Sequence, residues 1–328
     1  MQLGTETVLK YDTKITFINK PTNLKFYANN EKTEELIVEN EKYLALNGFM
    51  SLQDDKKRDI PIYWKWDFET GLSEKDKEEN DITDSSFIGK VMSMQIDVKG
   101  TQIDSNQFDD TAASVTFNGE IVNYNSIQEA INAAERNKGA IVSMAKDNIE
   151  EELIIGENQD LVLNLNSKTL NVKITNYGKV DIKGIGKIYG IIGSGITVHN
   201  VGIMNIYNKG IIKKEIESSG DVIAINNSGE LNIYSDLEII GLNPESGTGR
   251  GINNYGITNI FNGNISGKTF GVTNQSSGKI NVYNNAIIKK GLLNTVSTKE
   301  DAIISVYGGI IDNLYTVGPG KGKFYDYR

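Results

Sequence analysis

The chain has 328 residues, which is room for about two domains, and it is acidic, with 43 Asp and Glu against 34 Lys and Arg and a formal net charge of −9. This balance gives no basic footprint for nucleic acid or for an anionic membrane surface. The absence of cysteine excludes disulfides and cysteine metal sites, and no apolar run approaches the roughly 18 residues that a membrane span needs.

Residues 1–110 carry no repeat and predict a small antiparallel β-sandwich. Its expected strands are Lys14–Ile18, Leu24–Tyr27, Leu36–Val38, Ile60–Phe68 and Val91–Val98. The pair Asn47-Gly48 predicts a turn between strands. The charged run 73–86 predicts a solvated loop, because its carboxylates lack the spacing of a calcium-binding loop.

Both tryptophans lie in the expected strand Ile60–Phe68, whose residues alternate between apolar and charged side chains. One face of this strand is formed by Ile62, Trp64, Trp66 and Phe68. We therefore expect the tryptophans to pack in the core rather than to bind a sugar. The apolar residues that alternate from Met92 to Val98 are expected to form the opposing layer.

The polar segment 104–111 predicts the boundary to a second domain, residues 111–328. After this boundary, residues 114–122 predict a hairpin with Asn118-Gly119 at its tip.

A helix is expected over about residues 126–138, because Ser126 and Glu129 match a capping box. Its apolar stripe is formed by Ile127, Ala130, Ile131 and Ala134. Since the open end of a solenoid exposes unpaired strand edges, we expect this helix to cap the first coil.

A short sequence motif then recurs, and each copy begins with a glycine or alanine. Apolar residues follow that alternate with an asparagine or a similar polar residue, and most copies end with an aromatic residue. Its six copies begin at residues 178, 202, 229, 256, 278 and 302, and such a period is typical of a solenoid. In the second copy, strand alternation places Met204 and Ile206 inside and Asn205 and Tyr207 outside.

The triplet Asn-x-Gly precedes four copies and predicts a corner, because asparagine and glycine tolerate the positive φ that we expect a sharp corner to require. Further apolar stretches on both sides of each copy give up to three short strands per turn. The sequence therefore predicts an all-β chain, with an antiparallel β-sandwich followed by a parallel β-helix whose coils rise by about 4.8 Å.

The segment Ser114–Gly190 resembles the right-handed parallel β-helix domain of the pectate-lyase-like superfamily found on surface proteins of Gram-positive bacteria. The resemblance rests on Tyr124–Ile131, on Leu161–Leu170 and on the Asn-x-Gly corners that follow. These motifs are structural, so the resemblance implies the fold and a cell-surface location but no particular activity.

Residues Ile62–Gly71 and Met92–Val98 are similar to the camelysin and TasA-like modules of secreted, fibre-forming matrix proteins. This resemblance implies an extracellular location and assembly with other subunits. It also implies, in some cases, a homo-polymer formed by strand exchange, in which a terminal strand of one subunit completes the sheet of the next.

Enzymes of the β-helix type depend on carboxylates. The lyases need a carboxylate cluster that binds calcium beside an arginine or lysine base, and the hydrolases need two or three carboxylates close together. The outward positions of the repeats hold Asp181, Asn205, Asn232, Asn259, Asn281 and Ser305. Amides and a hydroxyl cannot perform this acid and base chemistry, so we expect no catalytic residue, no metal and no cofactor.

The remaining polar candidates are one histidine and two longer loops. His199 lies beside the corner residue Asn200, and we expect a turn histidine with a structural or neutral role, because no second acid or base flanks it. The loops 213–221 and 243–250 belong to adjacent coils, so their charged residues are expected to gather into one patch: Glu215, Glu217, Asp221, Glu245 and Arg250. This patch is the best candidate for a metal or glycan site, and plain solvated loops are the alternative.

The aromatic residues of the repeats form the candidate binding surface, and they are Tyr207, Tyr234, Phe261 and Tyr283. We expect their rings to stack along the axis beside a ladder of asparagine amides. Such a stripe either binds a glycan or a partner chain or only stabilises the rod.

Together these patterns predict a non-enzymatic, extracellular bacterial surface or matrix protein for adhesion or fibre assembly. Its expected partners are other subunits or surface glycans, with no nucleic acid and no membrane span. A polysaccharide lyase or glycoside hydrolase and a glycan-binding module without turnover are the alternatives. The tail after Gly318 contains no helix, so we expect either that the chain continues or that the tail folds back as a lid.

Overall fold

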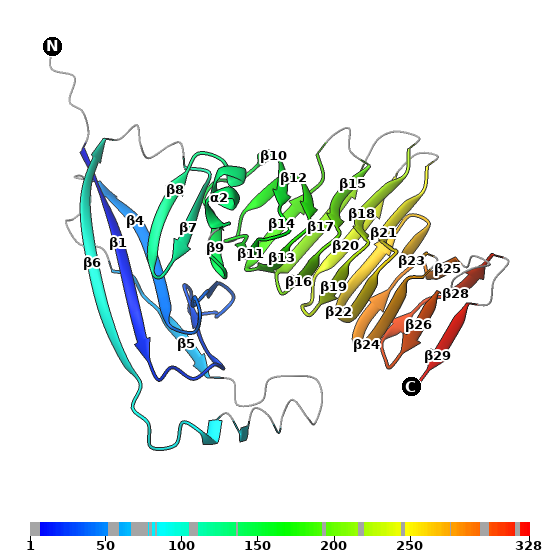
Figure 1. Ribbon diagram of the computed structural model, residues 1–328, viewed down its shortest axis with the longest axis horizontal. Helices are drawn as coiled ribbons and strands as arrows, with labels where there is room; N and C mark the ends of the chain where they lie inside the picture. Colours follow the sequence, from blue (N-terminus) through cyan, green and yellow to red (C-terminus); the bar gives the residue numbers. More distant parts are fainter. Residues whose placement is uncertain are drawn as a thin grey trace, which may run out of the picture. The chain divides into compact units, whose positions relative to one another are not determined.

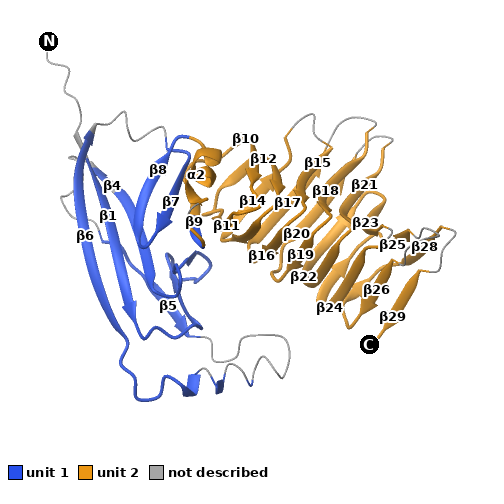
Figure 2. Cartoon of the chain, in the orientation of Figure 1, with its two compact units in different colours: residues 1–125, 139–141 blue, residues 126–138, 142–328 orange. Residues whose placement is uncertain are grey.

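The computed structural model describes residues 7–51, 59–66, 78, 81–82, 84–104, 111–135, 137–191, 195–215, 220–243, 247–275, 277–295, 302–318 and 322–328. The chain is nearly all β (Figure 1) and forms two compact units (Figure 2). Unit 1 comprises residues 1–125 and 139–141, and unit 2 comprises residues 126–138 and 142–328. The expected boundary at residues 110 and 111 lies ahead of a hairpin that groups with unit 1.

Unit 1 contains two three-stranded antiparallel sheets, with the strand orders β4-β1-β6 and β3-β2-β5. Their bounds are β1 (Thr7–Ile18), β2 (Leu24–Tyr27), β3 (Glu35–Leu36), β4 (Tyr43–Ser51), β5 (Tyr63–Trp66) and β6 (Ser93–Asp104). Ile15 and Phe17 of β1 pack with Leu24 and Phe26 of β2 in one buried cluster, in which the rings of Phe17 and Phe26 stack with centroids 4.8 Å apart. The two sheets therefore share a core, as expected for a sandwich.

The turn expected at Asn47-Gly48 is wrong, because both residues lie within β4. Gly48 lies opposite Tyr11 of β1, and a Cβ atom at Gly48 would be 2.1 Å from Tyr11 Oη. Glycine is thus required here for the close approach of a ring to the neighbouring strand rather than for a turn.

The expectation for the tryptophan face is correct for Trp66 and wrong for Trp64. Trp66 packs partly buried against the core, and its Nε1 donates a hydrogen bond to Asp84 Oδ1 at 3.2 Å. Trp64 is 61% exposed and lies on β5, an edge strand of the second sheet. Three parts of the expected sandwich lie wholly or mostly outside the described part of the chain: Phe68, the charged run 73–86 and residues 105–110. Of the charged run, the structure describes residues 78, 81–82 and 84–86.

The opposing layer expected from Met92 to Val98 is also mostly wrong. Met92 packs against the core, but Met94, Ile96 and Val98 are 53, 59 and 68% exposed. These three residues point to the same side of the sheet as Phe17, Ile15 and Thr13, with which they pair, yet the second sheet does not cover them. The core of the sandwich therefore ends before β6.

The hairpin is confirmed as β7 (Ala113–Phe117) and β8 (Glu120–Tyr124). Asn118 and Gly119 connect the strands with φ angles of 51 and 76°, the left-handed conformation that a two-residue turn of this type requires.

The helix is confirmed as α2 (Ile127–Ala134), which is shorter than the expected range. The Ser126 side chain accepts a hydrogen bond from the Glu129 backbone N–H at 3.0 Å, and the four residues of the predicted apolar stripe are buried. The Gln128 side chain bonds to both backbone groups of Ile154 in the first coil, at 3.0 and 2.7 Å. The helix thus occupies the strand edge in the way expected of a cap.

Unit 2 is a parallel β-solenoid of the right-handed type, with about seven turns and three strands in most turns. After β9 (Ala140–Met144), its first face contains β11 (Asp160–Asn164), β13 (Lys179–Lys183), β16 (Ile203–Ile206), β19 (Glu230–Ile233), the first parts of β22 (Ile257–Gly267) and β24 (Lys279–Ile288), β26 (Ile303–Val306) and β29 (Lys323–Asp326). The second face contains β14 (Ile185–Tyr189), β17 (Lys209–Glu215), β20 (Glu238–Leu242), the last parts of β22 and β24, and β27 (Ile310–Ile311). The third face contains β10 (Ile149–Ile155), β12 (Thr169–Asn176), β15 (Ile196–Asn200), β18 (Val222–Asn227), β21 (Gly249–Asn254), β23 (Phe270–Asn274), β25 (Leu292–Thr295) and β28 (Leu314–Val317).

The interior of the solenoid follows the predicted alternation. Ile206, Ile233 and Ile260 pair in register on successive coils, and all three are fully buried. The tail does not fold back as a lid, because β29 pairs in parallel with β26 and continues the first face by one rung.

Asparagines at the four predicted corners and at the same position of the next two coils form a buried chain of side-chain hydrogen bonds, which we call the corner ladder. Its members are Asn176, Asn200, Asn227, Asn254, Asn274 and Asn294. Each Nδ2 donates to the Oδ1 of the next member, at 2.7 to 3.1 Å. In Asn227, Nδ2 also lies 3.2 Å from Gly229 O and 2.9 Å from Ile257 O. The corner ladder thus forms hydrogen bonds within a corner and between that corner and the next coil.

The expected reason for glycine at these corners is wrong. The corner glycine Gly229 does not have positive φ, but a Cβ atom there would lie 2.1 Å from the carbonyl oxygen of Gly202 on the preceding coil. Close stacking of backbone on backbone therefore requires the glycine.

We expect Asn227→Ala to lower the free energy of unfolding by about 3 kcal/mol, because the change leaves buried partners on two coils without a hydrogen bond. The matched control is Asn259→Ala on the outer surface of the same coils, where water replaces the lost bonds and the expected loss is about 1 kcal/mol. Urea titration measures both losses. Equal losses for the two variants would show that the corner ladder does not hold the coils together.

Candidate functional site

Six aromatic rings stack along the outer surface of the first face, and we call this stack the ring ladder. Its members are Tyr207, Tyr234, Phe261, Tyr283, Tyr307 and Tyr327. Adjacent ring centroids are 4.4 to 5.1 Å apart, and the ring planes differ by 5 to 13°. The spacing is that of neighbouring strands, since each ring lies at the same position of successive coils.

The structure thus brings together the four aromatic residues that the repeats indicate, and it adds two. Tyr307 ends the weak sixth copy of the repeat, and Tyr327 follows β29 in the tail. The repeat period in the sequence indicates the position of Tyr307. The position of Tyr327 became clear only from the structure, in which the tail forms another rung.

The ring ladder presents ring edges to solvent. Tyr207, Tyr234 and Tyr307 are 41, 39 and 42% exposed, although each is covered by a stacked neighbour on at least one ring face. In the interior of the stack both ring faces are covered, so the accessible parts are edges and tyrosine hydroxyls.

A second row of side chains, the amide ladder, runs beside the rings on the same surface. It consists of Asp181, Asn205, Asn232, Asn259 and Asn281, and each Nδ2 donates to the oxygen of the preceding member at 2.7 to 2.9 Å. Ser305 occupies the next position in register. The amide ladder therefore contains one carboxylate, at its first rung, and its amides are bonded to one another.

Asp181 influences the first rings of the ladder. Burial, followed by the Asp181 carboxylate and the neighbouring Tyr234, raises the pKa of Tyr207 to about 12. Burial, then Glu230 and Asp181, also raises the pKa of Tyr234, and burial followed by Tyr307 raises the pKa of Tyr283. These hydroxyls consequently stay protonated near neutral pH and act as hydrogen-bond donors.

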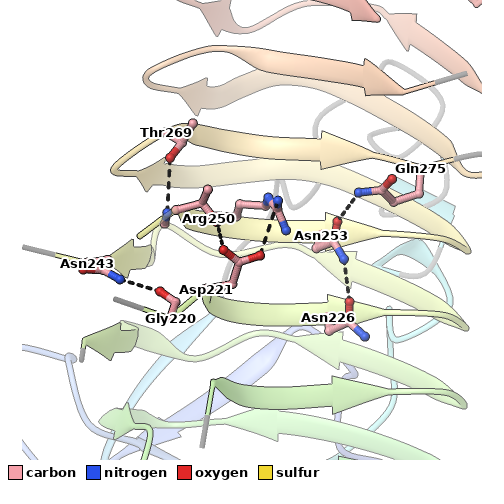
Figure 3. A network of polar contacts seen from close by, with 10 residues as sticks. Gly220, Asp221, Asn226, Asn243, Arg250, Asn253, Thr269 and Gln275 are labelled. Atoms are coloured by element: carbon pink, nitrogen blue, oxygen red, sulfur yellow. Dashed lines mark hydrogen bonds and ion pairs between the residues drawn. The ribbon is translucent and has the colours of Figure 1, made fainter. Parts of the chain in front are cut away.

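The charged patch is brought together only in part. Asp221 Oδ2 lies 3.8 Å from Arg250 Nη2 (Figure 3), and the Thr248 hydroxyl donates to Asp221 Oδ1 at 2.5 Å. Glu215 instead pairs with Lys213 on its own strand, at 2.5 Å. Glu217 and Glu245 lie outside the described residues. Within the part of the chain that the structure describes, no group of three or more His, Asp or Glu is placed to hold a metal ion.

The burial of Lys214 differs from the sequence prediction, in which residues 213–221 form a loop. Lys214 lies in β17, follows the buried Ile212 by two residues and is itself fully buried. Its Nζ donates to the carbonyl oxygen of Ile191 at 2.5 Å. Burial lowers the pKa of Lys214, and the alternation of β17 was the signal that placed it inside.

His199 lies within β15 rather than in a turn. It pairs in register with Thr175 on one side and Asn226 on the other. From Asn226 the outer row continues through Asn253 and Gln275 by side-chain hydrogen bonds of 2.8 and 2.7 Å (Figure 3). His199 thus lies in a row of polar side chains on the outside of the third face.

No protein-family model, curated protein or solved structure matches this chain significantly. The resemblances to the pectate-lyase-like superfamily and to camelysin and TasA-like modules therefore stay predictions, whereas the strand register itself shows the parallel β-solenoid. Among the described helical segments, none is long and apolar enough to span a membrane.

The pKa of Tyr207 in the folded protein, about 12, lies above the value of about 10 for an unfolded tyrosine. Its contribution to stability is therefore complete below about pH 10 and is lost as the pH rises through about 12. We expect Asp181→Asn to shift the last step of the tyrosinate absorbance titration to lower pH, because the amide keeps the ladder but removes the negative charge. An unchanged titration would contradict this coupling.

For Lys214 the direction is opposite. The pKa of Lys214 in the folded protein lies below its ordinary value of 10.5. Between these two pKa values the unfolded state binds more protons than the folded state, so the free energy of unfolding rises with pH there. We expect Lys214→Met to raise the free energy of unfolding by about 1 kcal/mol or more at neutral pH, and this gain to shrink toward about pH 10. The matched control is Lys213→Met on the outer side of the same strand, for which we expect a change below about 0.5 kcal/mol. Urea titrations at the two pH values test both statements, and a gain that does not change with pH would contradict the first.

Proposed function

We propose that this chain is a non-enzymatic, extracellular bacterial surface or matrix protein whose solenoid serves in adhesion or fibre assembly. The observation that carries the proposal is the ring ladder, a regular row of half-exposed aromatic edges and hydroxyls. Aromatic side chains of this kind are enriched at binding surfaces because they combine apolar area with a polar tip.

The geometry of the ring ladder favours a partner that repeats at the same spacing. Since the ring faces inside the stack cover one another, a sugar ring has no free aromatic face to stack on except at the ends. A second solenoid or the edge of another sheet repeats at about 4.8 Å and offers one contact per rung. We therefore assign the ring ladder to lateral contact between subunits, so that contact area grows with the number of coils.

The chemistry of the amide ladder supports a non-enzymatic role. Its single carboxylate, Asp181, accepts a hydrogen bond from Asn205 at 2.9 Å and lies 3.8 Å from Lys183 Nζ. Amide groups that bond to one another supply neither a general acid nor a general base. In the charged patch, Asp221 and Arg250 form an ion pair with each other, which is typical of a structural role.

Fibre assembly by strand exchange is the finer form of this proposal. It is supported by the similarity of Ile62–Gly71 and Met92–Val98 to TasA-like modules. In this form, other copies of the chain are the principal partners.

The test compares Tyr234→Ala with Tyr255→Ala. Tyr255 is 48% exposed on the next coil but lies at a corner outside the ring ladder, so it is the matched control. We expect Tyr234→Ala to abolish or reduce at least about tenfold the sedimentable assemblies and filaments seen by electron microscopy, and Tyr255→Ala to leave them unchanged.

Equal assembly by both variants would contradict the role of the ring ladder. Incubation with acidic and neutral polysaccharides, with and without calcium, tests the enzymatic alternative. Turnover that is lost in Asp221→Ala would overturn the proposal, and binding without cleavage that Tyr234→Ala weakens would favour a glycan-binding module instead.

A further inference from the structure

Strand β6 is an edge strand with unusual exposure. Within the described part of the chain it pairs only with β1, and its side chains from Ser93 to Gln102 are exposed on both faces of the sheet. It is also 12 residues long. A long edge strand of this kind offers a row of backbone groups for pairing with another strand.

The pairing of β1 shows which backbone groups of β6 point away from the sheet. The Phe17 N–H donates to Lys42 O on the β4 side at 2.8 Å, so Phe17, and with it Ile15, directs its backbone groups toward β4. Their partners on β6, Met94 and Ile96, are therefore not hydrogen-bonded to β1. The N–H and C=O groups of Met94, Ile96 and Val98 consequently point outward at the edge.

The side chains of the same three residues form an apolar stripe. Met94, Ile96 and Val98 are 53, 59 and 68% exposed and lie on the side of the sheet that faces the core. The opposite side of β6 carries Asp97 and Lys99, two residues apart. The edge therefore combines outward-pointing backbone groups, an apolar stripe and the opposite charges of Asp97 and Lys99.

We propose that β6 pairs antiparallel with β6 of a second copy of this chain, with the two-fold axis at Val98. The pairing joins the two β4-β1-β6 sheets into one continuous six-stranded sheet. A two-fold axis makes the contact isologous, so that it closes as a dimer and leaves no edge of β6 free. This inference does not depend on the ring ladder, which lies in the other unit.

Charge complementarity fixes the register. With Val98 opposite Val98 of the second copy, Asp97 lies opposite Lys99 of the second copy, and the reverse pair forms across the axis. These are non-hydrogen-bonded pairs, in which Cα atoms approach to about 4.5 Å and side chains come closest. A lysine on an edge strand ordinarily hinders edge pairing, but here each lysine meets an aspartate.

The alternative axes are less favourable. An axis at Asp97 or at Lys99 places two like charges opposite each other, which is destabilising. An axis at Ile96 pairs Asp97 with Gln95 and leaves the end of β6 beyond Lys99 without a partner. An axis at Val98 lies near the middle of the strand and lets Ser93 pair with Ile103 of the second copy.

Cysteine cross-linking tests the register on a background without cysteine. We expect Val98→Cys alone to form a disulfide-linked dimer under mild oxidation, because residues on the axis have Cα atoms about 5.5 Å apart. Ile96→Cys and Gly100→Cys lie opposite each other across the axis, so each alone should cross-link poorly and an equimolar mixture should cross-link well. A Cβ atom at Gly100 meets Leu9 at 3.4 Å, which is ordinary contact, so this variant is expected to fold.

The control is Ile310→Cys, which is 61% exposed on the solenoid. In sedimentation experiments without cross-linking, we expect Val98→Asp to raise the dissociation constant of the dimer by about tenfold or more, since two carboxylates then lie opposite each other. Unchanged thermal unfolding of the monomer would show that the variant folds.

Three outcomes would overturn the proposal. The first is cross-linking of Val98→Cys no greater than that of Ile310→Cys. The second is efficient cross-linking of Ile96→Cys alone, which would place the axis elsewhere. The third is open-ended polymers that disappear when residues 1–6 are deleted, because strand exchange rather than isologous pairing would then occupy the β6 edge.

Discussion

Hydrogen bonding between buried asparagine side chains at one corner of the solenoid is the interaction on which the rest of unit 2 depends. An amide at a fully buried position is costly unless its groups are paired, and Asn200 and Asn227 find their partners on neighbouring coils. A coil that slipped by one residue would lose these bonds and turn its apolar residues outward at the same time. The corner ladder therefore sets the register of every coil relative to the next.

Register in turn creates the outer surface of the first face. Once Ile206 and Ile233 lie above one another inside, the residues that follow them must also align, and their rings stack. The same alignment bonds the amides of Asn205 and Asn232 to each other. The ring ladder and the amide ladder are thus consequences of coil stacking, and their shared spacing follows from the strand spacing of about 4.8 Å.

Unit 1 is governed by a different constraint, the limited extent of its second sheet. Its core is formed where β2 covers β1 and β4, and apolar residues of β6 that lie on the same side stay exposed. Alternation in a strand shows which residues share a face, but it does not show whether another layer covers that face. For this reason Trp64 and Val98 look like core residues in the sequence and lie at the surface in the structure.

Local sequence determined much of this protein. The period of the repeats, their alternation and the capping motif at Ser126 determined the solenoid, its interior and its helix, because these features depend on nearest neighbours along the chain and on identical contacts between coils. Five of the six rings lie at the aromatic position of the repeat for the same reason, and four of them were predicted as the candidate surface. Only the tertiary structure decided the exposure of Trp64, the strand at Asn47-Gly48 and the additional rung, formed by β29, that brings in Tyr327. Each of these depends on what a distant segment places beside the residue, which no local pattern records.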